Sequence, residues 1–195
     1  MPDNLLPANG ELYYYPSFFT NEESLHYFNG LLDEISWKQE PIVIFGKKLM
    51  QPRLTAWYGD AGIAYRYSGI TMQPEPWTRM LNEIKTRLEK FSGFTFNSVL
   101  LNLYRDGQDS MGWHRDDEKE LGKNPAIGSV SFGDCRKFMI RHVQDRSLKN
   151  AINITNGSLL LMAGEMQHYW QHSIPKTAKP AGVRINLTFR KIIAP

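Results

Sequence analysis

The chain has 195 residues, of which 42% are hydrophobic and 22% are charged, with 15 Gly and 11 Pro. These values are typical of one globular domain over residues 1–195 and exclude a disordered, collagen-like or membrane-spanning chain. A single cysteine, Cys135, excludes an intramolecular disulfide framework and a cysteine-based zinc site. Residues 1–4 lack a basic region followed by an apolar stretch, so we expect a protein of the cytoplasm, nucleoid or nucleus rather than a secreted one. A monomer is the default expectation, since no pattern in the sequence indicates an oligomer.

The net charge of +3 is the sum of two opposite parts. Residues 136–195 carry ten Lys or Arg and two Asp or Glu, a net charge of +8, so residues 1–135 carry −5. This asymmetry predicts an anionic partner such as nucleic acid. Basic residues scattered over a solvated surface are the alternative.

The first predicted elements are two helices. Thr20 and Glu23 form a capping box that opens a helix. The apolar residues expected on its buried face are Leu25, Phe28, Leu32 and Ile35. A second helix is predicted over residues 77–91, and Gly93 is expected to end it.

After Gly93 the pattern changes to short strand-like runs separated by turn signals such as Asp106-Gly107. The strands expected from these runs cover residues 98–104, 128–132, 137–143, 158–162 and 182–192. Two helices followed by many strands, without alternation of strand and helix, predict a mainly β fold with flanking helices (α+β). We expect the helices to pack on an antiparallel sandwich or jelly roll.

The first chemical signal is the triplet His114-Arg115-Asp116. In an extended segment, residues two apart point to the same side, so the imidazole and the carboxylate can bind one ion. A surface ion pair is the alternative, because His-x-Asp alone is a weak motif.

A third metal ligand is predicted at His172, which follows a glycine-bounded run and precedes an arginine-bearing strand. His168 is the rival, and His26 and His142 are the other histidines available. Two His and one carboxylate would occupy one face of an octahedral Fe(II) and leave three positions open, as an oxygenase requires.

The segment from Arg184 to Arg190 alternates polar and apolar residues. Arg184, Asn186, Thr188 and Arg190 share one face, which is rich in donors suited to a dicarboxylate. A solvated amphipathic strand is the alternative. Because six residues of strand span about 20 Å, we assign the salt bridge with the distal carboxylate to Arg184 and place Arg190 nearer the metal. Asn102 and Tyr104 share another strand face and are expected to bind the same ligand.

Together these motifs, with Asn102-Leu103-Tyr104 upstream, resemble the AlkB family of Fe(II)/2-oxoglutarate dioxygenases. The resemblance covers roughly residues 40–195. It implies a double-stranded β-helix (jelly roll) core over residues 96–195, with residues 1–95 forming N-terminal helices and a nucleotide-recognition extension. It also implies Fe(II) and 2-oxoglutarate, and oxidative removal of alkyl groups from nucleobases with release of succinate, CO2 and formaldehyde.

The N-terminal half resembles the DNA-repair branch of that family. Phe45 matches a hairpin residue that wedges into duplex DNA, although the end of a buried edge strand would also explain it. Arg53 lies in a Gln-Pro-Arg motif of the same branch, and Tyr65 and Tyr67 resemble the lining of its base pocket. Paired strand tyrosines are otherwise half-buried packing residues.

Asp117 and Glu118 directly follow the metal-binding triplet. A solvated turn explains one of them, but acidic groups near the iron would also favour a cationic N-alkylated base over its neutral parent. The expected function is therefore demethylation of bases such as 1-methyladenine and 3-methylcytosine in single- or double-stranded DNA. An RNA demethylase or protein hydroxylase of the same family, or a catalytically silent nucleic-acid-binding relative, are the alternatives.

Overall fold

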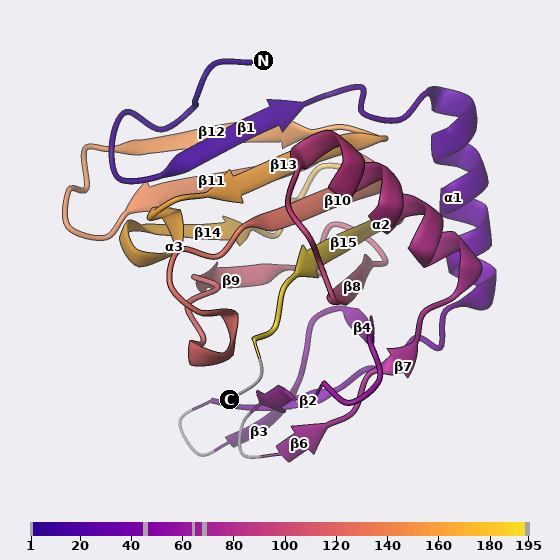
Figure 1. Ribbon diagram of the computed structural model, residues 1–195. Coiled ribbons are helices and arrows are strands. Elements are labelled where there is room, and N and C mark those ends of the chain that lie inside the picture. The colour runs from indigo at the N-terminus through magenta and orange to yellow at the C-terminus, as the bar shows by residue number, and fades with distance from the viewer. Residues whose placement is uncertain (1, 45–46, 64, 68–69, 194–195) are drawn as a thin grey trace.

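The computed structural model describes residues 2–44, 47–63, 65–67 and 70–193 (Figure 1). Two sheets form the body of the protein, which is a jelly roll. The larger sheet contains, in spatial order, β1 (Glu11–Tyr15), β13 (Ser158–Ala163), β10 (Ile127–Gly133), β15 (Arg184–Arg190), β8 (Ser98–Tyr104), β4 (Leu54–Gly59) and β7 (Glu75–Pro76). The smaller sheet contains β12 (Lys149–Ile154), β11 (Arg136–His142), β14 (Trp170–Ile174) and β9 (Met111–His114).

Two further strand pairs lie at the bottom of the view in Figure 1, beyond the end of the larger sheet. They are the antiparallel pairs β2 (Pro41–Ile44) with β3 (Lys47–Met50), and β5 (Tyr65–Tyr67) with β6 (Ile70–Met72). Short helical elements occupy two of the loops, namely the 3-10 helix at Lys119–Leu121 and α3 (Met166–Tyr169).

Helix α1 (Asn21–Glu34) begins as the sequence predicts. The Thr20 hydroxyl accepts a hydrogen bond from the Glu23 backbone N–H, and the Glu23 carboxylate accepts one from the Thr20 N–H, which completes the capping box. The predicted buried face is wrong at Leu25, which is 60% exposed, because the face that packs on the sheet is centred on Leu31.

Helix α2 (Arg79–Ser92) starts two residues later than residue 77, because the Thr78 side chain caps it by accepting from the Leu81 N–H. It ends at the predicted glycine: Gly93 has a φ of 75°, a left-handed conformation that a residue without Cβ adopts at little cost. None of the described helices is long and apolar enough to cross a membrane.

The five strands predicted from periodicity are confirmed with ends within two residues, and β8 has the predicted bounds. Alternation along these strands divides the core into two parts. On β15, Ile185, Leu187 and Phe189 face the helices, whose contribution to this apolar cluster includes Leu31 and Leu88. The other face of the larger sheet packs on the smaller sheet. That second cluster includes Tyr104, Phe138, Ile140, Leu160, Met162 and Trp170.

The protein therefore has three layers, in the order helices, larger sheet and smaller sheet. Strands from the N-terminal half take part in the larger sheet, since β1 pairs with β13 and β4 pairs with β8. The polar face of β15 points away from the helices, into the space between the two sheets, and this is where the site residues gather.

Candidate active site

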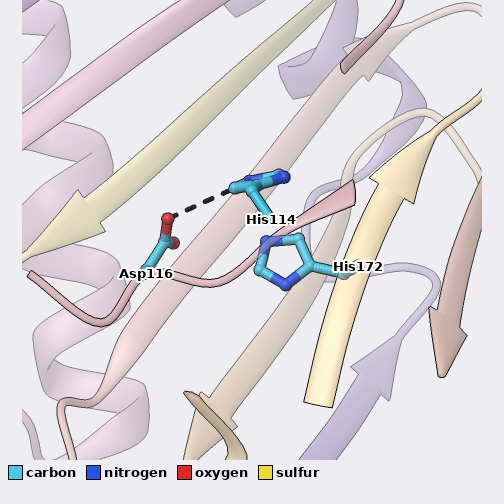
Figure 2. Close-up of side chains that lie close together, drawn as sticks. All are labelled: His114, Asp116 and His172. Atoms are coloured by element: carbon cyan, nitrogen blue, oxygen red, sulfur yellow. Dashed lines mark ion pairs between the residues drawn. The ribbon is translucent and has the colours of Figure 1, made fainter. Parts of the chain in front are cut away.

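His114, Asp116 and His172 come together at one edge of the smaller sheet (Figure 2). His114 ends β9 and His172 lies on β14, and the two residues are directly opposite each other in the antiparallel pairing of these strands. Their ring centroids are 4.2 Å apart, and one potential ligand atom from each of the three residues lies within 4.8 Å of the other two. His114 and His172, 58 positions apart in the sequence, thus meet because β9 and β14 pair.

Asp116 is 2% exposed, and its carboxylate and its backbone N–H each form one hydrogen bond. Arg190 Nη2 donates to its Oδ1 over 2.8 Å, and the Asp116 backbone N–H donates to the Gln167 side-chain oxygen over 2.9 Å. Burial alone would raise the pKa of this carboxyl, but the charge of Arg190, with contributions from the neighbouring His172 and His114, outweighs it and lowers the pKa. Asp116 is therefore an anion at neutral pH.

The surroundings of the two imidazole rings determine which nitrogen atoms face the other groups of the cluster. The His114 Nδ1 atom lies 2.8 Å from the Gly112 carbonyl, which can only accept, so Nδ1 is the donor and Nε2, 4.0 Å from Asp116 Oδ1, is the atom that faces the cluster. Burial and the neighbouring His114 lower the pKa of His172 to about 3, although Asp116 acts in the opposite direction. The His172 ring is therefore neutral at pH 7 and can bind a cation without first losing a proton.

The rival His168 lies elsewhere. Its ring is exposed, and its Nε2 atom is 2.9 Å from the Asn124 side-chain oxygen. His142 is buried beside the ring of Tyr169, on the smaller sheet. Of the candidate histidines, His172 is the one that lies together with His114 and Asp116.

The predicted cosubstrate residues line one narrow cavity between the sheets. Arg184 and Asn186 on β15 are paired with Tyr104 and Asn102 on β8, so the two predicted pairs are cross-strand neighbours. Thr188 Oγ1 donates to the Asn186 side-chain oxygen over 3.2 Å. At the other end of the same strand, Arg190 contacts Asp116, so it lies at the metal end as the spacing predicts.

Arg184 has two nitrogen atoms with no hydrogen-bond partner among the described residues. The side chain is 1% exposed, and Nη2 donates to Ser131 Oγ over 2.9 Å, but Nε and Nη1 are buried and unpaired. An unsatisfied buried guanidinium is costly, and a carboxylate bound in two-point geometry would satisfy it. Burial lowers the pKa of Arg184, a penalty that an anionic ligand would relieve.

Sequence reasoning missed three residues that hold these groups. Ser131 supports Arg184, and Ser129 Oγ accepts from Asn186 Nδ2 over 2.8 Å. Gln167 accepts from the Asp116 N–H. The two serines have a sequence signal, because they alternate with apolar residues along the buried strand β10, opposite the polar face of β15. Gln167 has none, since its partner is a backbone N–H 51 residues away.

A second cavity of about 280 Å³ opens beside the metal-ligating group, next to the β2–β3 pair. It is lined by His114, Asp116 and Arg190 from the metal end, and by Arg53, Trp57 and Glu118 among others. Arg53 is 6% exposed, and its Nε donates to the Asn102 side-chain oxygen over 2.7 Å, so it joins this cavity to the cosubstrate cavity.

The remaining predicted substrate residues are placed in part. Asp117 pairs with Arg115 over 2.6 Å at the half-exposed surface, while Glu118 lines the second cavity. Phe45 lies outside the described residues. Tyr65 and Tyr67 lie on β5, but the positions of their side chains are outside the description.

Two imidazoles and a carboxylate at the edge of a jelly roll, with arginine-bearing β15 beside them, are typical of oxygenases that use Fe(II) and an oxoacid. The model of the 2OG-Fe(II) oxygenase superfamily matches residues 11–190, so the chain belongs to that superfamily, whose cofactors are Fe(II) and 2-oxoglutarate. The residues fit both groups. Three ligating atoms converge for the metal ion, and Arg184, at the end of β15 opposite Arg190, has two unpaired buried nitrogen atoms for a carboxylate.

Among its relatives, the chain is 41% identical over 179 residues to the cattle "DNA oxidative demethylase ALKBH2", covering 88% of the chain and 62% of that protein. It is 41% identical over 187 residues to the human "Alpha-ketoglutarate-dependent dioxygenase alkB homolog 3", covering 91% of the chain and 65% of that protein. The chain thus spans less than two thirds of the length of both. The predicted membership of the AlkB family, on the side of its DNA-repair branch, is confirmed.

A solved structure titled "The structure of OsALKBH1" superimposes with a TM-score of 0.64 over 92% of this chain and 97% of that one. The sequence identity is 17%, so this likeness concerns the fold. It confirms the predicted jelly roll.

Proposed function

We propose that this protein removes alkyl groups oxidatively from N-alkylated DNA bases such as 1-methyladenine and 3-methylcytosine. The observation that supports this most is the 280 Å³ cavity, which meets the metal-ligating group on one side and Glu118 on another. The relatives named as DNA oxidative demethylases support the choice of DNA. Repair of alkylated DNA would take place in the nucleoid or nucleus, with the protein acting as a monomer.

In this proposal His114, Asp116 and His172 hold the iron, and Arg184 binds the distal carboxylate of 2-oxoglutarate. Tyr104, Asn102, Asn186 and Thr188 complete the cosubstrate cavity, while Arg190 orients Asp116 and closes the cavity at the metal end. When bound, Fe(II) and 2-oxoglutarate would supply the oxidising chemistry: O2 would convert 2-oxoglutarate to succinate and CO2 and place its second oxygen atom on the alkyl carbon, which would leave the base as formaldehyde.

The protein residues supply selectivity for a charged, damaged base. N-alkylated adenine and cytosine carry a positive charge. The Glu118 carboxylate, which lines the cavity near Asp116, would attract such a base more strongly than a neutral one. A damaged base also pairs poorly, so its extrusion from the duplex costs less than that of a normal base. In this proposal Tyr65 and Tyr67 belong to the pocket for the extruded base, and Arg53 lines the cavity beside Asn102.

Contacts with the DNA backbone would come from the basic C-terminal part. Arg141 and Lys149 are cross-strand neighbours on β11 and β12, and Lys137 is exposed on the same strand as Arg141. The Arg141 guanidinium lies 4.1 Å from the ring centroid of Trp113, which is next to the ligand His114. Phosphate contacts from such a surface give affinity without sequence preference.

The test is formaldehyde release from methylated oligonucleotides in the presence of Fe(II) and 2-oxoglutarate. We expect release from single-stranded or duplex DNA by the wild-type protein and none by Asp116→Ala. Undiminished release by that variant would contradict the metal assignment. Turnover confined to RNA or to a protein substrate would replace the DNA proposal by another activity of the family, and no turnover of 2-oxoglutarate would favour a silent binding protein.

The proposed wedge has its own test. Phe45→Ala should reduce activity on duplex DNA more than on single-stranded DNA, because only the duplex needs help with extrusion. Equal losses on the two substrates would argue against a wedge at Phe45.

A further inference from the structure

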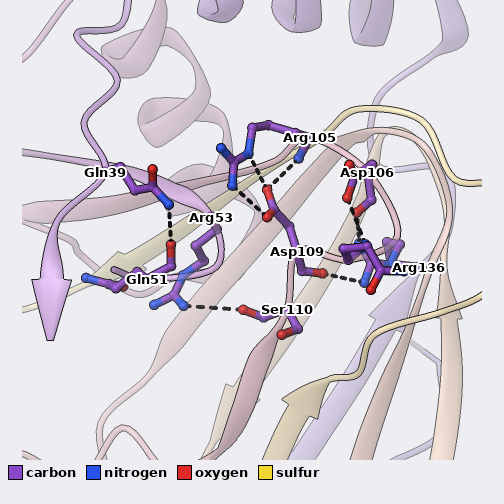
Figure 3. A network of polar contacts seen from close by, with 9 residues as sticks. Gln39, Gln51, Arg53, Arg105, Asp106, Asp109, Ser110 and Arg136 are labelled. Atoms are coloured by element: carbon purple, nitrogen blue, oxygen red, sulfur yellow. Dashed lines mark hydrogen bonds and ion pairs between the residues drawn. The ribbon is translucent and has the colours of Figure 1, made fainter. Parts of the chain in front are cut away.

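Arg136, the first residue of β11, is a buried arginine that the proposed function leaves without a role. It is 2% exposed. Its Nη1 donates to the Asp106 carbonyl over 3.0 Å and its Nη2 donates to the Asp109 carbonyl over 2.8 Å (Figure 3). The same Nη2 also donates to the Pro175 carbonyl over 2.8 Å. The charged guanidinium thus donates hydrogen bonds to three neutral carbonyls. Its flat, forked shape reaches all three, whereas a lysine ammonium has a different geometry and cannot form the same three bonds.

The three carbonyls lie in segments next to strands that hold candidate site residues. Asp106 and Asp109 lie in the connection between β8, which holds Tyr104 and Asn102, and β9, which holds His114. Pro175 directly follows β14, which holds His172. One side chain on β11 therefore links the β8–β9 connection to the residue that follows β14.

Arg136 also reaches the cosubstrate cavity through an aromatic ring. Its guanidinium carbon is 5.5 Å from the ring centroid of Tyr104, and that of Arg184 is 5.1 Å from the same centroid. Tyr104 is 2% exposed, so the ring has little freedom to move. A guanidinium is attracted to an aromatic face, so the position of each arginine is coupled to the ring that both contact.

Arg184 depends on that placement. Ser131 holds only its Nη2 atom, so contact with Tyr104 helps to determine where the unpaired Nε and Nη1 atoms point. Two guanidinium charges beside one ring also raise the positive potential at this end of the cavity, which favours a ligand with a carboxylate there.

We propose that Arg136 is a positioning residue for the cosubstrate: through Tyr104 and the ends of β8, β9 and β14, it aims Arg184 at the distal carboxylate of 2-oxoglutarate. This inference rests on the proposed role of Arg184 and is independent of the nucleic-acid substrate. It predicts an effect on the distal carboxylate specifically, rather than on binding in general.

The chain offers a matched control in Arg105. This arginine lies in the same loop and forms an ion pair with Asp109, over 2.8 Å from Nε to Oδ2, yet 45% of its side chain is exposed. Its described hydrogen bonds end on the Asp109 side chain and not on the strand ends. Loss of Arg105 disturbs the loop without removing the link to Tyr104.

The experiment measures binding by calorimetry, without oxygen or nucleic acid, using protein loaded with Mn(II) in place of Fe(II). The ligands are 2-oxoglutarate and 2-oxopentanoate, which has the same carbon chain but lacks the distal carboxylate. The variants are Arg136→Lys, Arg136→Met and Arg105→Met. Arg136→Lys keeps the charge and serves where Arg136→Met fails to fold, as judged from the melting temperature without ligand.

We expect the Kd for 2-oxoglutarate to rise about tenfold in Arg136→Lys and further in Arg136→Met, while Arg105→Met stays within about twofold of wild type. The Kd for 2-oxopentanoate should be unchanged in all three. Equal losses for both ligands, an equal loss in Arg105→Met, or wild-type affinity in the Arg136 variants would each overturn the proposal. Failure of the wild-type protein to bind 2-oxoglutarate would instead contradict the proposed function itself.

Discussion

Arg190 Nη2 lies 2.8 Å from Asp116 Oδ1, so a buried ion pair joins β15, in the middle of the larger sheet, to the segment that follows β9. The pair engages one carboxylate oxygen, lowers the pKa of the carboxyl together with the two histidines, and fixes its direction. A metal ligand held in this way needs no rearrangement when the ion arrives. The same strand that carries Arg184 thereby also determines the geometry of the metal end.

The first prediction follows from this pair. Arg190→Met should weaken Mn(II) binding by about tenfold or more, because residues that orient metal ligands typically have effects of this size. Arg190→Lys, which keeps the charge, should lose less. Calorimetric titration of the metal without cosubstrate measures both, and an affinity unchanged in Arg190→Met would show that Asp116 does not need its partner.

The second prediction separates the two C-terminal histidines. His172→Ala should abolish measurable Mn(II) binding, since it removes one of three converging ligands. His168→Ala is the matched control, because that exposed ring contacts Asn124 and not the metal-ligating group. Both variants are titrated under the same conditions. A loss of metal binding in His168→Ala, with retention in His172→Ala, would reverse the assignment.

The third prediction concerns Asp109 and pH. Burial would raise the pKa of this carboxyl, but three hydrogen bonds from Arg105 and the nearby charge of Arg136 lower it. A carboxyl with a lower pKa in the folded state stabilises the protein above its unfolded pKa of about 3.9, and this contribution is lost as pH falls through the folded pKa.

Asp109→Asn should therefore lower the free energy of unfolding by roughly 1–2 kcal/mol at pH 7, a modest value because Arg105 is half-exposed. The gap between variant and wild type should shrink as pH falls below about 4. Urea unfolding at a series of pH values measures this gap. A gap that widens toward acid pH would mean that the Asp109 pKa is raised on folding.

The sequence predicts best what short-range pattern controls. Strand β8 and the start of α1 have the predicted bounds because alternation in Ser98–Tyr104 and the Thr20 capping box are local signals. Strand β1, with the sequence ELYYY, lacks such alternation, and it forms by pairing with β13 about 150 residues away. Among the candidate site residues, motif spacing predicted His114 and Arg184, which the fold places at the two ends of one cavity. Arg136 and Gln167 were missed because their partners are backbone groups brought close only by the fold.

The fourth prediction tests the corrected face of α1. Helical spacing alone predicts that Leu25 is buried, but it is 60% exposed, whereas Leu31 is fully buried against the larger sheet. Leu31→Ala should lower the free energy of unfolding by about 2–5 kcal/mol, through lost burial and the cavity left behind. Leu25→Gln, one and a half turns earlier on the same helix, should change it by less than about 0.5 kcal/mol. Urea unfolding of the two variants beside wild type decides the matter, because a large loss in Leu25→Gln would restore the face predicted from periodicity.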